Sequence, residues 1–341
     1  MRVYDLSTLG WSAELAESIE EGLVPGRVAV VHRGGYLVLT AAGERRARLP
    51  GSARNAGLDV AVGDWVGLDD ELVRAVLPRR SLLARQAAGR ETGRQLLAAN
   101  VDVAFVVTSF GPDLEPRRLE RYLAAVWESG ATPVVLLTKA DLEPDPEVAA
   151  LAVEAVAVGA AVHTVSVVDG RGLDAVASYL RPGVTAVLLG SSGVGKSTLV
   201  NRLAGAELLR TNDVRADDGK GRHTTTHREL VVLPGGGIVI DTPGLRELQL
   251  WEGDLEGTFA DVEELAGDCR FNDCSHTREP DCAVLAAIDE GTLPLDRLRS
   301  YRKLQRELFS AQVRQDAHLR HVEARRWAAL QRDGRARARR R

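Results

Sequence analysis

The stretch Gly190-Ser-Ser-Gly-Val-Gly-Lys-Ser197 determines how the rest of the chain is interpreted. It follows a short apolar run at residues 185–189 and precedes residues 198–203, which have the pattern of an amphipathic helix. A strand, then G-x-x-x-x-G-K-[ST], then a helix is the context that distinguishes a phosphate-binding loop from a simple glycine turn. Glycines let backbone N–H groups turn inward, and these groups form an anion cradle with the helix N-terminus. The stretch therefore predicts a nucleoside triphosphate site.

The loop residues have separate expected roles. Lys196 is positioned to reach the β- and γ-phosphates, and the Ser197 hydroxyl is a candidate Mg²⁺ ligand. The residues expected to contact the nucleotide here are Gly190, Ser191, Ser192, Gly193, Val194, Gly195, Lys196, Ser197 and Thr198.

Two further stretches narrow the choice of nucleotide. Ile238-Val-Ile-Asp241-Thr-Pro-Gly244 is an apolar run that ends in an acid, where a Walker-B Asp holds Mg²⁺ directly or through water. Thr138-Lys139-Ala-Asp141 also ends an apolar run and resembles the [NT]-K-x-D guanine motif of GTPases. A carboxylate at Asp141 suits guanine, whose N1–H and N2–H₂ groups are both donors, whereas adenine offers no such pair. Together these motifs predict GTP as the ligand.

The order of the motifs is unusual, because the guanine motif precedes the phosphate loop. In most GTPases the phosphate loop comes first, so the chain looks like a circularly permuted GTPase. A parallel sheet keeps its ligand site at the carboxyl ends of its strands whatever their order in the chain. Strands alternate with helices from residue 95 onward, which predicts an α/β P-loop GTPase domain over residues 95–250. Ser166, the last residue of an expected strand at residues 162–166, is the candidate contact to the guanine base.

The polar, glycine-containing stretch at residues 213–227 is expected to be switch I. One of Thr224, Thr225 and Thr226 should ligate Mg²⁺ and sense the γ-phosphate, and composition does not choose among them. Leu245 follows D-T-P-G where Ras-like GTPases have a Gln that orients the attacking water. Leu cannot hydrogen-bond a water, so intrinsic hydrolysis should be slow. His223 is the nearest replacement in sequence, and its alternative interpretation is a solvent-exposed loop histidine.

The composition of the chain is that of an ordinary globular protein. It has 341 residues, 45% hydrophobic residues and a net charge of −4, so any nucleic-acid contact must come from local basic patches. The N-terminus has no signal-peptide pattern, and residues 148–168 are interrupted too often for a membrane span. The three cysteines cluster at residues 269–282, which favours a metal site in a reducing compartment. We therefore expect a cytoplasmic protein with no membrane partner.

Short strands and glycine-rich turns at residues 24–78 predict a small all-β barrel of the oligonucleotide-binding (OB) kind. Tyr36 and Trp65 are its candidate stacking aromatics, and a solvated basic surface is the alternative reading of its arginines. An N-terminal extension (residues 1–23) precedes the barrel, and an exposed linker (residues 79–94) is expected to follow it.

Cys269, Cys274, His276 and Cys282 form a Cys₃His set, the structural zinc pattern. With four protein ligands, no coordination position is left open for catalysis. The set predicts one structural Zn²⁺ in a mainly helical domain at residues 251–330. Residues 331–341 form a basic tail; such arms are commonly just solvated, but they are also typical of RNA-binding proteins.

The whole ordered set resembles the bacterial ribosome small-subunit-dependent GTPase A family. The resemblance rests on a β-barrel, T-K-x-D before G-x-S-G-x-G-K-S, then G-R-H-T-T-T, D-T-P-G and C-x₄-C-x-H-x₅-C. It implies a GTPase that acts late in assembly of the small ribosomal subunit, contacts its rRNA and is stimulated by it. It also implies GTP and GDP as ligands, Mg²⁺ with GTP, and the four zinc ligands above; we expect a monomer.

The resemblance also assigns residues that spacing leaves open. Thr225 is the best match for the switch I magnesium ligand, beside Ser197 and Asp241. Gly244 matches switch II with Asp241, and His223 matches a histidine proposed to aid hydrolysis. Thr138 departs from the commoner Asn and keeps only one hydroxyl, so guanine affinity is expected to be somewhat weaker.

Three rival functions remain at this point. A GTP-gated rRNA-binding module with negligible hydrolysis is favoured by Leu245. An ATP-dependent kinase or ATPase is disfavoured by Asp141. An RNA-binding protein with a vestigial site would bind neither nucleotide.

Overall fold

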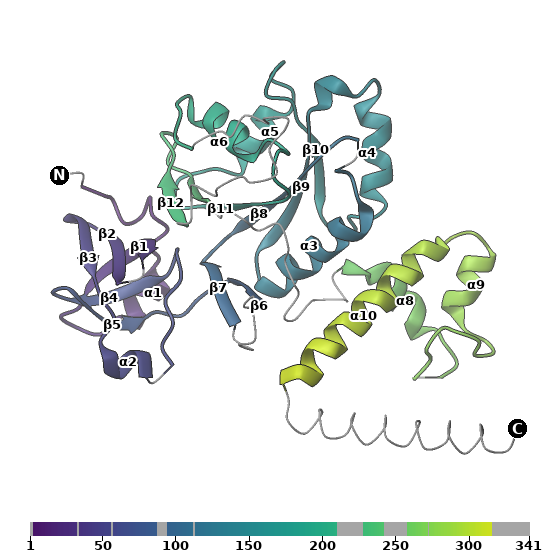
Figure 1. Ribbon diagram of the computed structural model, residues 1–341, viewed down its shortest axis with the longest axis horizontal. Coiled ribbons are helices and arrows are strands. Elements are labelled where there is room, and N and C mark those ends of the chain that lie inside the picture. The colour runs from purple at the N-terminus through teal and green to yellow at the C-terminus, as the bar shows by residue number, and fades with distance from the viewer. Residues whose placement is uncertain are drawn as a thin grey trace, which may run out of the picture. The chain divides into compact units, whose positions relative to one another are not determined.

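The computed structural model describes residues 3–32, 34–55, 57–86, 94–111, 113–209, 228–241, 258–271 and 273–315. The chain separates into two compact units (Figure 1). The first comprises Met1–Ala84 and Leu96–Leu248, and the second comprises Arg85–Gln95 and Gln249–Arg341.

A parallel sheet forms the centre of the first unit. Its strands run in the order β10-β9-β8-β11-β13, and every neighbouring pair among them is parallel. Chain order moves outward from β8 to β9 and β10, then returns to the other side of β8 with β11 and β13. The switch point therefore lies between β8 and β11, where α/β sheets bind ligands at the strands' carboxyl ends. The strands are β8 (Val103–Ser109), β9 (Thr132–Thr138), β10 (Ala161–Thr164), β11 (Thr185–Leu189) and β13 (Ile238–Asp241).

Helices cover both faces of this sheet, because side chains alternate along buried strands. Ala104 and Val106 of β8 belong to the same core as α3 (Pro116–Ser129) and α4 (Pro146–Glu154). Phe105 and Val107 share the other core with α5 (Leu173–Ser178) and α6 (Lys196–Ala204). A 3₁₀ turn, η1 (Ala140–Leu142), follows β9. The sequence prediction of a permuted α/β sheet is confirmed.

Five antiparallel strands form a small barrel in the same unit. β1 pairs with β2 and β4, β2 pairs with β3, and β4 pairs with β5. A bridge between Arg48 and Leu72 closes the ring. β12 (Glu229–Val232) pairs antiparallel with both β13 and β1, so the barrel continues the parallel sheet. The strands are β1 (Val24–His32), β2 (Gly35–Thr40), β3 (Gly43–Ala47), β4 (Trp65–Asp69) and β5 (Leu72–Val76), with α1 (Ala13–Ser18) before them and α2 (Gly51–Asn55) between β3 and β4.

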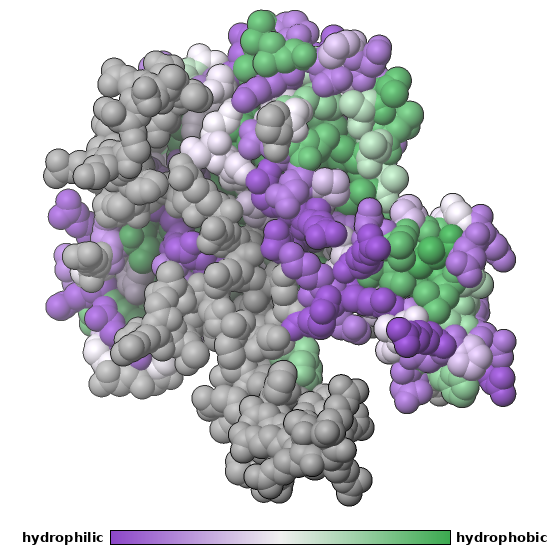
Figure 2. All heavy atoms as spheres, turned by 45° about the vertical axis from the view of Figure 1, so that its right-hand side comes forward, coloured by the Kyte–Doolittle hydropathy of each residue, from purple (hydrophilic) through white to green (hydrophobic). Residues whose placement is uncertain are grey.

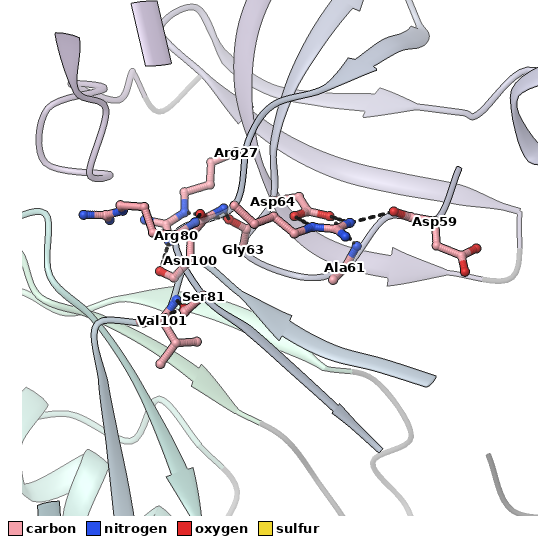
Figure 3. A network of polar contacts seen from close by, with 10 residues as sticks. Arg27, Asp59, Ala61, Gly63, Asp64, Arg80, Ser81, Asn100 and Val101 are labelled. Carbon is pink, nitrogen blue, oxygen red and sulfur yellow. Dashed lines mark hydrogen bonds and ion pairs between the residues drawn. The ribbon is translucent and has the colours of Figure 1, made fainter. Parts of the chain in front are cut away.

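Arg27 of β1 is fully buried where the barrel meets the parallel sheet (Figure 3). Its guanidinium donates to the carbonyl oxygens of Leu9, Gly63 and Asn100, and to the Thr185 hydroxyl at 2.7 Å. Burial lowers the pKa of Arg27 to about 10, so the side chain is still a cation at neutral pH. These contacts tie the first residue of β11, the strand before the phosphate loop, to the barrel.

Two expectations from the sequence are wrong. Residues 82–86 are not an exposed linker but form β6 (Leu82–Gln86), which pairs with β7 (Arg94–Ala99). Leu83 is buried in the core, and the burial of its apolar side chain favours an ordered strand although its sequence neighbours are polar. Trp65 is not available for stacking on a nucleic acid, because it is 1% exposed and packs edge-on against Trp11.

The second unit contains three described helices, α8 (Ala260–Gly267), α9 (Ala283–Asp289) and α10 (Leu295–Gln315). Buried Arg297 of α10 pairs with Asp261 of α8 at 2.9 Å and stacks over Phe259, with its guanidinium carbon 4.3 Å from the ring centroid. The unit therefore has its own polar and aromatic core.

The surface mixes hydrophobic and hydrophilic side chains, as the face in Figure 2 shows. Among the described residues, none of the helices is sufficiently long and apolar to cross a membrane.

Candidate functional site

The phosphate loop connects β11 to α6 at the switch point of the sheet. Three of its glycines have positive φ, with 144° at Gly190, 84° at Gly193 and 93° at Gly195. A Cβ on Gly190 would lie 2.1 Å from the carbonyl oxygen of Val107 in β8. Glycine is therefore required where the loop leaves β11, because any side chain would push β8 away.

Lys196 is the first residue of α6 and turns back over the loop. Its Nζ donates to the carbonyl oxygens of Gly190 at 2.9 Å and Ser191 at 2.6 Å. Ser197 and Thr198 follow in the first turn of the helix. A cation and a helix N-terminus thus converge on one loop, an arrangement that attracts phosphate.

The guanine motif lies beside this loop. The buried Thr138 hydroxyl lies 2.6 Å from the Val194 carbonyl oxygen and 3.1 Å from that of Thr108, within hydrogen-bond distance of both. Lys139 takes a left-handed conformation, with φ of 59°, that turns the chain out of β9 into η1. Residues that are 56 positions apart in the sequence are joined in this way.

Asp141 and Ser166 also meet, as expected if both read one base. The fully buried Ser166 hydroxyl donates to Oδ1 of Asp141 at 2.7 Å. It also accepts from the backbone N–H of Val168 at 3.2 Å, so the hydroxyl is fixed by its own loop. Asp141 itself is exposed, so its carboxylate faces solvent where a ligand can approach.

Asp241 ends β13, the strand next to β11 on the side away from β8. Burial raises the pKa of its carboxyl group, and the positive charge of Lys196 opposes this shift. A partly buried carboxylate at the edge that carries Ser197 offers hard oxygen ligands of the kind Mg²⁺ prefers. The residues present therefore fit a magnesium ion with a nucleotide.

Several predicted site residues lie outside the described part of the chain. His223, Thr224, Thr225 and Thr226 fall within residues 210–227, and Gly244 and Leu245 fall within residues 242–257. Their roles remain predictions.

A second constellation lies in the second unit. The ligand atoms of Cys269, Cys274, His276 and Cys282 all lie within 4.8 Å of one another. The Sγ atoms of Cys269 and Cys282 are 3.7 Å apart, and they lie 3.6 and 3.5 Å from Nδ1 of His276. A tetrahedron with zinc-type bond lengths has edges of about 3.5–3.8 Å. These three distances match that geometry, and Sγ of Cys274 lies within 4.8 Å of the other ligand atoms, so the group could hold a metal ion.

The protonation state of His276 also fits a ligand role. Burial lowers its pKa, and the positive charge of Arg302 acts in the same direction, which favours the neutral imidazole that binds metals. Arg302 of α10 donates through Nη2 to the carbonyl oxygens of Ser275 and His276. Sequence reasoning missed this clamp because Arg302 is 26 residues from His276 and belongs to no motif.

Comparison with known proteins agrees with this geometry. The model of the family described as RsgA GTPase matches residues 76–251. A protein of Lactiplantibacillus plantarum named small ribosomal subunit biogenesis GTPase RsgA 2 is 50% identical over 298 residues, covering 85% of this chain and 84% of the relative. A protein of Streptomyces coelicolor named small ribosomal subunit biogenesis GTPase RsgA is 48% identical over 329 residues, covering 92% and 90%.

Two solved structures have the same fold. YjeQ from Thermotoga maritima aligns with a TM-score of 0.63 and 26% identity, covering 84% of this chain and 98% of that one. YloQ, described as a circularly permuted GTPase, aligns with a TM-score of 0.61 and 25% identity, covering 84% and 96%.

Proposed function

Because the chain belongs to the RsgA GTPase family, we propose that it hydrolyses GTP to GDP and phosphate during late assembly of the small ribosomal subunit, which stimulates the reaction. The observation that carries the proposal is the contact of the Thr138 hydroxyl with the Val194 carbonyl. It brings the guanine motif and the phosphate loop together at the switch point, although the chain has them in permuted order.

Guanine is recognised through Asp141. Its carboxylate accepts from the two donors on the Watson–Crick edge of the base, and Ser166 holds Oδ1 so that the carboxylate keeps one orientation. Thr138 and Lys139 line the same site. An adenine base would leave the carboxylate without matching donors, which is costly for a desolvated charge.

Phosphate charge is neutralised by Lys196 and by backbone N–H groups of residues 190–195. On binding, Lys196 exchanges its two carbonyl contacts in the loop for phosphate oxygens. Ser197, Asp241 and Thr225 would hold Mg²⁺, which would supply positive charge to neutralise the phosphates. A water attacks the γ-phosphorus in line, and the bond from this phosphorus to the bridging oxygen breaks, so that GDP leaves with that oxygen. One proton of the water stays on inorganic phosphate and the other is released to solvent.

The attacking water needs an orienting group that Leu245 cannot provide. We assign this role to His223, either by direct contact with the water or by ordering switch I. Slow hydrolysis in the free protein, and stimulation by the subunit, follow from the need to order this group.

Two other parts of the chain are proposed to contact small-subunit RNA in the cytoplasm. The five-stranded barrel, with α2 between β3 and β4, is of the OB kind. Its β2–β3 side carries a groove of ≈ 790 Å³ lined in part by Tyr36, Arg46 and Arg48. The Cys₃His group holds one structural Zn²⁺, and the chain acts as a monomer.

Nucleotide competition tests the assignment of GTP. A fluorescent GDP should be displaced by GTP and not by an equal concentration of ATP. Asp141→Asn should weaken GTP and favour xanthosine triphosphate, because the new amide can donate to the base where the carboxylate accepted. Equal displacement by ATP would contradict the assignment.

The second candidate is an rRNA-binding module that uses GTP only as an on-state ligand. Leu245 favours it because the usual water-orienting residue is replaced. Release of many phosphates per protein in the presence of subunits would exclude this candidate.

A further inference from the structure

Phe271 is exposed in the metal-ligand loop of the second unit. Of the five phenylalanines in the chain, Phe271 and Phe309 are the exposed ones, at 40% and 45%. Phe271 lies between Cys269 and Cys274, and its carbonyl accepts from the backbone N–H of Cys274 at 3.1 Å. The ring is therefore partly open to solvent, where a ligand can reach it.

Arg270 lies beside this ring. Its guanidinium carbon is 5.5 Å from the ring centroid, within the range of a cation–π contact. Nη1 of Arg270 also pairs with Asp281 at 2.8 Å, just before the last metal ligand. The ion pair with Asp281 thus holds the guanidinium over the ring, while the Phe271 side chain stays 40% exposed.

The surface is organised before any partner binds. Cys269 and Cys274 belong to the Cys₃His group on either side of Phe271. Arg302 clamps the next stretch of the loop through the carbonyls of Ser275 and His276. Because these contacts hold described residues on both sides of the ring, less conformational entropy is lost when a ligand stacks on it.

The charges of the loop indicate which chemical group would stack there. Residues 268–282 contain four acidic residues and two arginines, so the loop does not attract phosphate or an anionic membrane strongly. A nucleobase presents a flat, uncharged face, and unpaired RNA bases stack on aromatic rings and on arginine planes.

We propose that Phe271 and Arg270 form a stacking platform for an unpaired base of small-subunit RNA. The inference rests on the proposed function, which brings the chain onto this RNA, and adds the class of ligand and the residues that contact it. Phe271 supplies the ring on which a base stacks, and Arg270 lies over that ring and is held there by Asp281.

The test measures binding of the full-length chain, with a non-hydrolysable GTP analogue, to purified small ribosomal subunits. Phe271→Ala and Phe271→Leu should weaken binding by about 5- to 150-fold, the range for loss of one base–aromatic stack. Phe271→Trp should restore it, because the indole keeps the planar face that Leu lacks. Phe309→Ala is the matched control, with equal chemistry and similar exposure, and should bind like the wild type. Zinc content should be equal in all variants.

Salt dependence separates stacking from phosphate contact. Phe271→Ala should leave the slope of log Kd against log salt unchanged, because no phosphate contact is removed. A changed slope would contradict the proposal.

Wild-type affinity for Phe271→Ala, or equal loss in the Trp and Leu variants, would overturn the platform while leaving the proposed function standing. If the wild type itself does not bind subunits, the proposed function fails. The platform is then tested with a single-stranded RNA dodecamer of mixed sequence, and equal binding by wild type and Phe271→Ala refutes it.

Discussion

Replacement of Arg27 by lysine is expected to destabilise the first unit more than replacement by methionine, although lysine is the conservative change. Arg27 serves four acceptors from four segments with one planar fork. Lysine has a single nitrogen and cannot reach them all. Gly63 keeps a second donor, Nδ2 of Asn100 at 3.1 Å, whereas no second donor to the Leu9 and Asn100 carbonyl oxygens is seen among the described residues.

The structure gives the size of the effect. Two buried carbonyl groups without donors cost about 1–3 kcal/mol each, so Arg27→Lys should lose about 2–6 kcal/mol. Arg27→Met leaves the same groups unpaired but buries no charge. Burial lowers the pKa of Arg27 to about 10, which shows that a charge at this position is disfavoured, and methionine removes this cost.

Urea unfolding of the full chain measures both variants, with the free energy taken from the shift of the midpoint at unchanged slope. Arg74→Lys is the control, because Arg74 pairs with Asp69 on the surface, where their side chains are 47% and 56% exposed, and should change the free energy by less than about 1 kcal/mol. An Arg27→Lys variant within about 1 kcal/mol of the wild type would refute the reasoning, as would a methionine variant less stable than the lysine variant.

Three further predictions concern the two sites. Thr138→Val removes the hydroxyl that contacts Val194, so it should lower the free energy of unfolding by about 1–3 kcal/mol and weaken GTP binding. Thr132 is exposed at the start of the same strand, so Thr132→Val should change neither quantity. Equal effects of the two variants in thermal melts and nucleotide titrations would contradict the role of the contact. Asp241→Asn should lose the Mg²⁺-dependent part of GTP affinity without lowering the melting temperature of the free protein, because burial disfavours the charged carboxylate. In the wild type, the effect of Mg²⁺ on GTP affinity should fade as the pH drops toward the raised pKa of Asp241. An effect of Mg²⁺ that does not depend on pH would contradict Asp241 as a ligand. Removal of the proposed Zn²⁺ with a chelator, or Cys282→Ser, should expose the second unit to proteolysis while GTP binding persists. Unchanged protection in limited proteolysis would contradict a structural metal in this unit.

The parts of the fold that could be predicted from sequence are those in which local pattern and chemistry coincide. At residues 190–197, the glycines suit a loop with positive φ, and the flanking residues suit a strand and a helix. All of these local preferences therefore agree on a strand–loop–helix structure. The spacing of the three cysteines and His276 in the sequence was enough to predict that their ligand atoms lie close together. Asp141 and Ser166 were predicted to share a base, and the structure brings them within 2.7 Å, although their role in binding is still a prediction.

The features that sequence did not reveal depend on contacts between distant residues. Nothing in the residues around Arg27 indicates that it crosses from the barrel to Thr185, 158 positions away. Trp65 and Leu83 look like surface or linker residues in their local context, and only packing against other segments buries them. The contact of Thr138 with Val194 could not be predicted without the order of the strands in the sheet, because a single hydroxyl contact produces no pattern in the sequence.

Steady-state GTP turnover, measured with and without purified small ribosomal subunits for the wild type and His223→Ala, tests the central claim most directly. The account predicts that subunits raise the wild-type rate about tenfold or more, equivalent to at least about 1.4 kcal/mol of barrier, and that the variant loses this rise while still binding GTP. Tight GTP binding with no stimulation by subunits would contradict a subunit-activated GTPase and favour the nucleotide-gated binding module.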